Sequence, residues 1–324
     1  FRLDMSKKVR WGVLSTASIG TDLVIPAMQK GAYTKVVGIS SRSKEKAEKA
    51  ANELGISASY GSYEELLADE EIDAIYNPLP NHLHVPMTIK ALEAGKHVLC
   101  EKPVAMNAEE AEELVETSRK YPNLKVMEAF MYRFHPQWEL VKKWIEEGEI
   151  GEVNTVQSVF TYFNDDPDDI RNKEGIGGGG LMDIGCYCIS ASRYIFGDEP
   201  IEVLGEVELD PEFGVDRLAS GILKLPNGTA SFICGTQTSP EQHLQVFGTK
   251  GIIEMDIPFN PLENVATVRL KKEGKVEKEK ETQANHYTLQ GDAFSKAILE
   301  DTPVPTPLED AVGNMRIIEA LLEK

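Results

Sequence analysis

The first 128 residues alternate short apolar runs with longer amphipathic stretches, and this alternation limits the possible folds more than any other feature of the chain. The apolar runs are Val9 to Leu14, Val36 to Ser40, Ala74 to Asn77, His97 to Cys100 and Leu124 to Glu128. The stretches between them carry apolar residues at helical spacing. Strands and helices that alternate at these lengths predict a parallel sheet covered by helices on both faces.

The pattern changes after about Trp144. Runs such as Val153 to Phe163, Leu218 to Leu225 and Thr229 to Cys234 are typical of successive strands, with turn residues between several of them, as antiparallel hairpins require. A chain of 324 residues also exceeds what one hydrophobic core usually serves. We therefore predict two domains, residues 7–128 and residues 129–324, with two closing helices that can pack back on the first domain.

Charge excludes two classes of partner. The chain has 53 acidic and 34 basic residues, a formal net charge of −19, so it repels nucleic-acid phosphates and anionic lipid surfaces. No apolar stretch approaches the roughly 20 residues that a membrane span needs. We therefore expect a soluble, cytoplasmic protein. Residues 1–6 are interpreted as a tail, with Met5 where a native start could lie.

The four cysteines and six histidines do not form a metal-binding pattern. The cysteines show no CxxC pair, and the histidines are scattered, so we expect reduced thiols and no metal site. The cysteines are Cys100, Cys186, Cys188 and Cys234.

The turn after the first apolar run resembles a degraded dinucleotide-binding fingerprint. Ser15 and Ala17 occupy the first two glycine positions of GxGxxG, and only Gly20 remains. Small residues still let a pyrophosphate approach the start of a helix, where hydroxyl groups can add donors. An ordinary strand-helix turn is the alternative. The candidate cofactor contacts are Ser15, Thr16, Ala17, Ser18 and Ile19.

The end of the second apolar run favours NADP over NAD. NAD-binding sheets usually place an acidic residue there, about twenty residues after the turn, to bind the ribose hydroxyls. This chain instead has Ser41 and Arg42, with Lys46 one helical turn later, a set that suits a 2′-phosphate. The alternative is a helix N-cap, Ser43, beside a solvated arginine.

Four motifs occur in an order that resembles a known family. They are the loop Asn77 to His84, the segment Glu101-Lys102-Pro103, the segment Arg133 to Pro136, and the run Gly177 to Tyr187. Together they resemble the Gfo/Idh/MocA oxidoreductases over nearly the whole chain. Tyr187 stands where inositol-dehydrogenase-like members carry histidine. The chain is therefore most similar to the branch that holds glucose-fructose oxidoreductase, dimeric dihydrodiol dehydrogenase and NADP-dependent D-xylose dehydrogenase.

The resemblance implies a fold and an assembly. The fold is α/β: an N-terminal Rossmann-like, doubly wound parallel sheet and a C-terminal α+β domain with a large, mostly antiparallel open sheet. The assembly is a homodimer or homotetramer built through that sheet. The resemblance also implies further cofactor contacts at Pro78, Leu79, Asn81, His84, Glu101, Lys102 and Arg171.

The candidate catalytic residues are Lys102, Tyr187 and Asp183. The helix that follows the glycine run places Asp183 and Tyr187 on one face, four residues apart. Oxidation of an alcohol needs a group that accepts the hydroxyl proton, and a tyrosine can do so when a neighbouring cation favours its ionised form. Lys102, just past a strand, is the candidate cation, and Asp183 would orient substrate hydroxyls or the lysine. The alternatives are a core ring and a helix-start carboxylate.

These observations predict an NADP(H)-dependent oxidoreductase acting on CH–OH groups of a sugar or polyol, first of all at C1 of an aldose. The predicted substrate contacts are Lys102, Arg133, Asp183 and Tyr187. The closest alternative enzyme oxidises trans-dihydrodiols or reduces dicarbonyls. A catalytically silent nucleotide-binding regulator of a sugar pathway is the alternative of another class.

Overall fold

The computed structural model describes residues 7–323, and the chain divides into two compact units. Unit 1 comprises the described residues up to Met131 together with Asn285–Val312. Unit 2 comprises Tyr132–Ala284 and the described residues from Gly313 onward. The final helix α9 (Glu309–Leu322) is thus shared between the units. Residues 1–6, interpreted above as a tail, lie outside the described residues.

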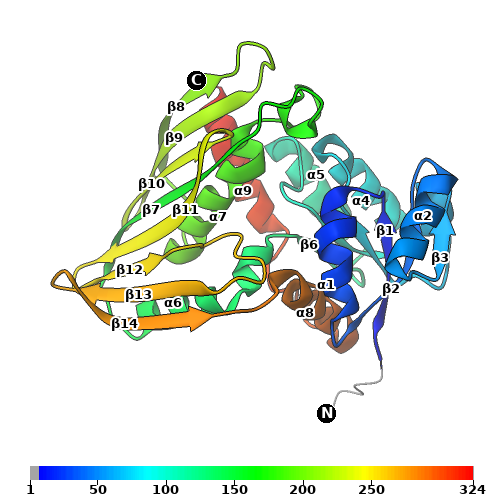
Figure 1. The fold of residues 1–324 in the computed structure, drawn as a ribbon, viewed down its shortest axis with the longest axis horizontal. Helices are drawn as coiled ribbons and strands as arrows, with labels where there is room; N and C mark the ends of the chain where they lie inside the picture. Colours follow the sequence, from blue (N-terminus) through cyan, green and yellow to red (C-terminus); the bar gives the residue numbers. More distant parts are fainter. Residues whose placement is uncertain (1–6, 324) are drawn as a thin grey trace. The chain divides into compact units, whose positions relative to one another are not determined.

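Unit 1 contains a parallel sheet of six strands in the order β3-β2-β1-β4-β5-β6, which confirms the doubly wound fold (Figure 1). The strands are β1 (Val9–Leu14), β2 (Thr34–Ser40), β3 (Ala58–Tyr60), β4 (Ala74–Asn77), β5 (His97–Cys100) and β6 (Val126–Glu128). The order reverses between β1 and β4, the position where open parallel sheets bind ligands at the carboxyl ends of their strands.

Helices cover both faces of this sheet. The Trp11 indole N–H donates to Ser295 Oγ of α8 at 3.0 Å on one face. On the other face a Cβ added to Gly12 would lie 2.9 Å from the side chain of Leu66 in α3. The helical elements are η1 (Ile19–Val24), α1 (Ile25–Gln29), α2 (Lys44–Leu54), α3 (Tyr63–Leu67), η2 (Asn81–Leu83), α4 (His84–Glu93), α5 (Ala108–Arg119) and α8 (His286–Glu300).

Unit 2 contains a sheet of eight strands in the order β14-β13-β12-β11-β7-β10-β9-β8. The neighbouring strands are antiparallel except β7 and β10, which are parallel, so the prediction of a mostly antiparallel sheet is confirmed. The strands are β7 (Val153–Phe163), β8 (Glu202–Leu209), β9 (Asp216–Leu225), β10 (Gly228–Gly235), β11 (Gln237–Gly248), β12 (Ile252–Met255), β13 (Ala266–Lys272) and β14 (Lys275–Thr282).

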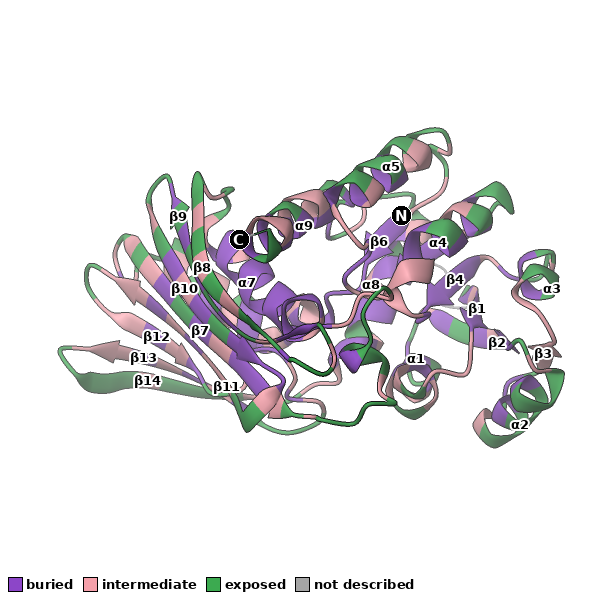
Figure 2. Ribbon diagram, turned by 90° about the horizontal axis from the view of Figure 1, so that it is seen from above, coloured by how far each residue is buried: buried purple, intermediate pink, exposed green. Residues whose placement is uncertain are grey.

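One face of this sheet is buried and the other is open. Buried and exposed residues alternate along β9, and Figure 2 shows the same alternation of purple and green across the neighbouring strands. Helices α6 and α7 contact the sheet. The helical elements of this part are η3 (Met131–Phe134), α6 (Pro136–Glu146), η4 (Ile170–Asn172), η5 (Leu181–Gly185) and α7 (Cys186–Phe196).

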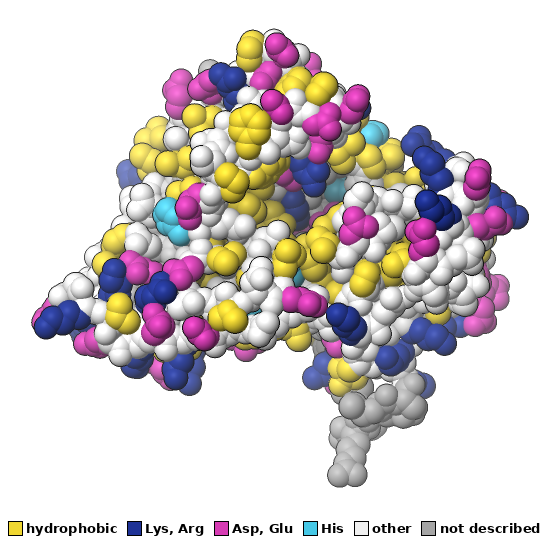
Figure 3. Space-filling view, viewed as in Figure 1, with side chains coloured by type: hydrophobic (Ala, Val, Ile, Leu, Met, Phe, Trp, Pro, Cys, Tyr) yellow, Lys and Arg dark blue, Asp and Glu magenta, His cyan; other side chains and the backbone are white. Residues whose placement is uncertain are grey.

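Strands β13 and β14 are not among the strands predicted from the sequence; lysine and glutamate dominate β14, whereas β13 buries Ala266, Val268 and Leu270 in alternation. Their charges pair across strands: Arg269 contacts Asp256 and Glu279, each at 2.6 Å. Figure 3 shows basic and acidic side chains intermingled at the lower left, over β13 and β14. Opposite charges that face each other stabilise this strand pair in addition to the apolar residues that β13 buries.

Candidate active site

The turn after β1 adopts a backbone conformation that usually needs glycine. Ser15, at the first glycine position of the degraded fingerprint, has φ 72°, in the left-handed region that glycine usually occupies. Its Oγ accepts the N–H of Ala17 at 3.2 Å, and the carbonyl of Ala17 accepts the N–H of Gly20 at 2.9 Å. Thr16 and Ser18 complete the turn, and Ile19 begins the helix η1. The chain thus keeps the turn although it has lost the glycines.

The end of β2 combines a helix cap with two exposed cations. Ser43 is the N-cap of α2, and its Oγ accepts the N–H of Lys46 at 3.4 Å. Ser41 is nearly buried, and its Oγ accepts the N–H of Ser43 at 3.2 Å. Arg42 and Lys46 are exposed. The cap and the cationic pair therefore coexist, and they occupy the place where an acidic residue binds ribose hydroxyls in NAD-binding sheets.

The loop after β4 is tied to the loop after β5 by His84. The two ring nitrogens of His84 lie 2.7 Å from the carbonyl oxygen of Pro103 and 2.6 Å from that of Leu79. The pKa of His84 is lowered to about 4, chiefly by burial, and the nearby charge of Lys102 acts in the same direction. His84 therefore braces the two loops, while Pro78 is buried and Asn81 is partly exposed.

Glu101 and Lys102 follow β5 at the same edge of the sheet. The Tyr76 hydroxyl donates to Glu101 Oε1 at 2.7 Å, and the N–H of Lys102 donates to Glu101 Oε2 at 3.3 Å. Lys102 is partly exposed. The segments after β1, β2, β4 and β5 thus gather every predicted cofactor residue of unit 1 along one edge, because parallel strands end together.

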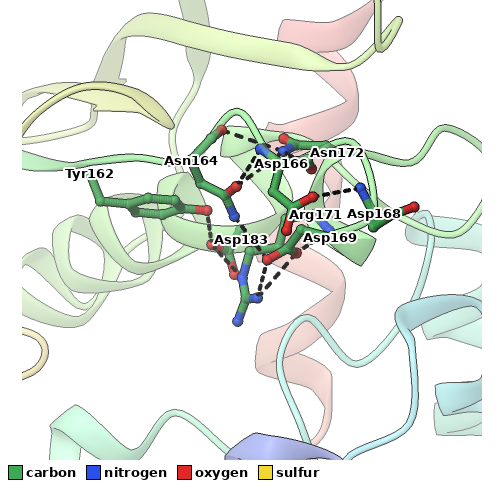
Figure 4. Close-up of polar contacts among 8 residues, drawn as sticks. All are labelled: Tyr162, Asn164, Asp166, Asp168, Asp169, Arg171, Asn172 and Asp183. Atoms are coloured by element: carbon green, nitrogen blue, oxygen red, sulfur yellow. Dashed lines mark hydrogen bonds and ion pairs between the residues drawn. The ribbon is translucent and has the colours of Figure 1, made fainter.

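Asp183, the candidate residue in η5 of unit 2, is held by two side chains from other segments (Figure 4). The hydroxyl of Tyr162, near the end of β7, donates to Asp183 Oδ2 at 2.6 Å. Arg171 Nε lies 3.3 Å from the same oxygen. The Asp183 side chain is 18% exposed, so solvent and small molecules can still reach it. Burial and the charge of Asp183 raise the pKa of Tyr162, which keeps this phenol as the donor.

Arg171 is in turn fixed by its own loop. Its Nη1 donates to Asp169 Oδ1 at 3.3 Å, and Asn164 Nδ2 donates to the other carboxylate oxygen of Asp169 at 2.8 Å. Burial raises the pKa of Asp169, but hydrogen bonds from Arg171 and Asn164 outweigh burial and hold that pKa below its ordinary value. The pKa of Arg171 is raised, chiefly by Asp183. The loop thus presents a cation beside Asp183.

Tyr187 lies in an aromatic cluster of unit 2. Its ring is 5.5 Å from Phe160, 5.7 Å from Phe259 and 5.9 Å from Tyr132, centroid to centroid. It is 5% exposed. The ring therefore has the packing of a core residue, which fixes the direction of its hydroxyl whatever chemistry that group performs.

Arg133 is anchored inside unit 2. Its Nη2 donates to Ser190 Oγ at 2.7 Å, its Nε donates to the Tyr132 hydroxyl at 3.3 Å, and its guanidinium lies 4.8 Å from the ring centroid of Tyr194. These contacts lead from Arg133 to the helix that carries Tyr187. They make Arg133 a support of that helix as well as a predicted substrate contact.

Sequence analysis missed three residues of this site: Tyr162, Asp169 and Asp216. Asp216, the first residue of β9, is buried, and its carboxylate accepts the N–H of Leu181 at 2.6 Å. None of the three belongs to a motif, so only their contacts reveal them. Within residues 7–323 no group of three or more histidine, cysteine, aspartate or glutamate side chains is placed to hold a metal ion. No helix in that range is both long and apolar enough to cross a membrane.

Two family models match the chain. One is described as an oxidoreductase family with an NAD-binding Rossmann fold and matches residues 9–130. The other is described as a GFO/IDH/MocA C-terminal domain and matches residues 138–254.

Individual relatives are similar over most of their length. The chain is 43% identical to an uncharacterized oxidoreductase of Rhizobium meliloti, over 97% of this chain and 96% of that one. It is 37% identical to D-xylose 1-dehydrogenase (NADP(+)) 2 of Haloferax volcanii, over 97% and 96%. It is 36% identical to trans-1,2-dihydrobenzene-1,2-diol dehydrogenase of Xenopus tropicalis, over 76% and 74%.

A solved structure shares the fold along the whole chain. It is a 3-ketoreductase from Actinomadura kijaniata in complex with NADP and TDP-benzene, which is 28% identical and has a TM-score of 0.90 over 98% of both chains. The likeness in sequence and the likeness in fold point to the same group of enzymes.

Proposed function

This chain belongs to the GFO/IDH/MocA oxidoreductase family, and on that premise we propose that it transfers a hydride between NADP(H) and a sugar or polyol, most simply at C1 of an aldose. The observation that carries the proposal is the shared sheet edge of unit 1. The turn at Ser15, the pair Ser41 and Arg42, and Lys102 all follow strands of one parallel sheet. The predicted nucleotide-binding residues and Lys102 are thus collected where such sheets bind ligands.

The residues of unit 1 fit NADP. The positive φ at Ser15 opens the turn for a pyrophosphate, and residues 15–19 supply N–H and hydroxyl donors at the start of a helix. Ser41, Arg42 and Lys46 supply hydroxyl and cationic groups for a 2′-phosphate, with no carboxylate among residues 40–44 to repel it. The nicotinamide, when bound, supplies or accepts the hydride.

The protein's own side chains handle the proton and the substrate. Lys102 binds the reacting oxygen as a hydrogen-bond donor, and Tyr187 accepts the hydroxyl proton during oxidation and returns it during reduction. Asp183, whose orientation Tyr162 and Arg171 fix, accepts hydrogen bonds from a neighbouring hydroxyl of the substrate. Within unit 2, Arg171 lies beside Asp183 and Arg133 supports the helix that carries Tyr187.

Relatives support an aldose and also a second candidate. The xylose dehydrogenase of Haloferax volcanii favours aldose oxidation with NADP. The relative from Xenopus tropicalis favours oxidation of a trans-dihydrodiol. A nucleotide-binding regulator without catalysis is disfavoured, because such a protein has no need of Lys102, Asp183 and Tyr187 together.

Purified protein incubated with NADP⁺ or NAD⁺ and a panel of aldoses, polyols and trans-dihydrodiols tests the proposal through absorbance at 340 nm. We expect reduction of NADP⁺ with at least one aldose, and weaker activity with NAD⁺. Turnover with the dihydrodiol alone would select the second candidate. Tight NADPH binding without turnover in either direction, dicarbonyl and lactone reduction included, would select the regulator.

The open face of the unit 2 sheet supports self-association. Leu204 of β8 pairs with Ile222 of β9, and each is 48% exposed; Ile233 of β10 is 41% exposed. Figure 3 shows hydrophobic side chains gathered at the upper left, over β8–β10. An exposed apolar sheet face of this kind favours a second copy of the chain. We expect a homodimer or homotetramer by light scattering at micromolar concentration, and a smaller mass for Ile222→Asp but not for Leu289→Asp on α8.

A further inference from the structure

Asp216 is a buried carboxylate that none of the proposed steps uses. It is 3% exposed, and its Oδ2 accepts the N–H of Leu181 at 2.6 Å, while the N–H of Gly180 also bonds to its carboxylate. Leu181 begins η5, which continues into α7, so the carboxylate caps the N-terminus of the helical segment that carries Asp183 and Tyr187. A carboxylate at the N-terminus of a helix accepts hydrogen bonds from N–H groups that have no partner within the helix. Its negative charge also interacts favourably with the helix dipole.

Two glycines of the run before η5 make room for this carboxylate. A Cβ added to Gly179, whose φ is 110°, would lie 2.1 Å from Asp216 Oδ1. A Cβ added to Gly180 would lie 3.3 Å from Oδ2. The carbonyl of Gly179 in turn accepts the N–H of Asp183 at 3.0 Å. The glycine run therefore serves an internal contact, and that contact reaches Asp183 through a single hydrogen bond of the backbone.

Holding a charge at Asp216 costs stability. Burial raises the pKa of Asp216 to about 6 against the opposing effect of the N–H groups of Leu181 and Gly180, and the charge of Asp183 on η5 acts in the same direction as burial; the Cys234 thiol of β10 also faces the carboxylate. A folded pKa above the unfolded value means that the folded state binds more protons between about pH 4 and 6, so the contribution of Asp216 to stability falls as pH rises through that window. A carboxylate kept for stability alone would show the opposite direction.

Asp210, close by in sequence, shows that opposite direction. Its carboxylate accepts N–H groups from Phe213 at 2.9 Å and Glu212 at 2.8 Å, and the Gln237 amide at 2.7 Å. These bonds lower its pKa, so its ionised form stabilises the fold. Asp210 is likewise buried, and the hydrogen bonds of its carboxylate go to residues 212, 213 and 237 rather than to the Gly179–Leu181 turn. It is therefore a matched control for Asp216.

We propose that Asp216 is a positioning residue of the active site, which fixes the Gly179–Leu181 turn and through it the orientation of Asp183 and Tyr187. The inference rests on the proposed function for its catalytic meaning. It requires that loss of the charge damages turnover more than it damages the fold.

Asp216→Asn and Asp210→Asn separate positioning from stability. The asparagine at 216 keeps one oxygen acceptor, so the variant folds, but its NH₂ group faces an N–H donor and the turn shifts. A displacement of about 1 Å at a catalytic group can reduce turnover by about 10²-fold. We expect such a loss of kcat in Asp216→Asn, with unchanged NADPH Kd and no decrease in Tm. We expect Asp210→Asn to show a lower Tm and wild-type kcat.

The pH profile gives an independent readout. Wild-type kcat should decline as pH falls through about 6, because protonated Asp216 no longer accepts both N–H groups. Asp216→Asn should lack this decline, and Asp210→Asn should retain it. Wild-type kcat in Asp216→Asn, or the same decline in that variant, would overturn the proposal.

Amide hydrogen exchange tests the same contact without any substrate. Wild-type protein should protect the segment 179–187, and Asp216→Ala should increase exchange there while Asp210→Ala leaves it unchanged. If no substrate is turned over, the proposed function fails, yet this measurement still decides whether Asp216 holds the turn. Equal exchange in wild type and Asp216→Ala would mean that Asp216 does not fix the turn, even in an active enzyme.

Discussion

The two units collect their predicted functional residues in different ways. In unit 1 the residues at Ser15, Arg42, His84 and Lys102 follow successive strands of a parallel sheet, so chain topology alone brings them to one edge. In unit 2 Asp183 is oriented by side chains that lie 21 residues away at Tyr162 and 12 residues away at Arg171.

The difference lies in what determines each arrangement. An edge of parallel strands tolerates changes in side chains, because the backbone direction places the loops; the turn at Ser15 survives without two of its glycines. A network of paired side chains depends on each partner. Variants in unit 1 should therefore affect one ligand contact at a time, whereas variants in unit 2 should affect several groups together.

The largest expected effect comes from substituting one residue of each unit. Lys102→Met and Tyr187→Phe should each lower kcat by about 10² to 10⁴, the usual range for positioned acid-base groups, with little change in NADPH affinity. The double variant should be barely worse than either single one, because groups that act in one step are not additive.

Steady-state kinetics of the three variants, with Lys90→Met as an exposed-lysine control, checks this prediction. Losses that multiply in the double variant would mean that the two units contribute to separate steps. Wild-type kcat in Lys102→Met would place the chemistry on another residue.

His84, which connects the loops after β4 and β5 in unit 1, should make the free energy of unfolding depend on pH. The pKa of His84 is about 4 in the folded chain and 6.5 in the unfolded chain, so the unfolded state binds more protons between these values. Stability should therefore be lost as pH falls from 6.5 to 4, by up to about 3 kcal/mol from this residue.

Denaturant unfolding of wild type and His84→Gln across that range measures the effect as the difference between the two. His243→Gln, at a more exposed histidine, is the control. A slope that is the same with and without His84 would contradict the assignment.

The choice of cofactor tests unit 1 at a single contact. Arg42→Ala should weaken NADP binding by roughly 1 to 3 kcal/mol, the loss of a charge-assisted phosphate contact, and leave NAD binding nearly unchanged. Fluorescence titration with NADPH and NADH gives both affinities, and Lys44→Ala, also exposed at the start of α2, is the control. Equal losses of affinity for the two cofactors would mean that Arg42 does not bind the 2′-phosphate.

The smallest effect concerns the network of unit 2. Tyr162→Phe removes the hydroxyl that donates to Asp183, which should lower kcat/KM by about tenfold, the value of one hydrogen bond to a charged group. Tyr60→Phe is the matched control, because the Tyr60 hydroxyl donates to Asp69 in unit 1 and takes no part in the network of Asp183. If both variants keep wild-type kcat/KM, Asp183 does not need its phenol partner.

The sequence by itself determined the parallel sheet, the mostly antiparallel second half, the positions of the cofactor loops and the cationic end of β2. Each follows from local periodicity or from the residues directly after a strand, and parallel strands turn such local signals into a shared edge. Strand β14 lay outside that signal, because charged residues and cross-strand ion pairs replace the apolar pattern there.

Only the tertiary structure decided how Asp183 is held and why the glycine run exists. Tyr162, Arg171 and Asp216 reach the start of the helix from three different segments, and α8 returns to Trp11 from 284 residues away. Such contacts depend on how whole elements pack, because a buried polar group must find its partner wherever packing brings one. No regular spacing of residues along the chain predicts these contacts.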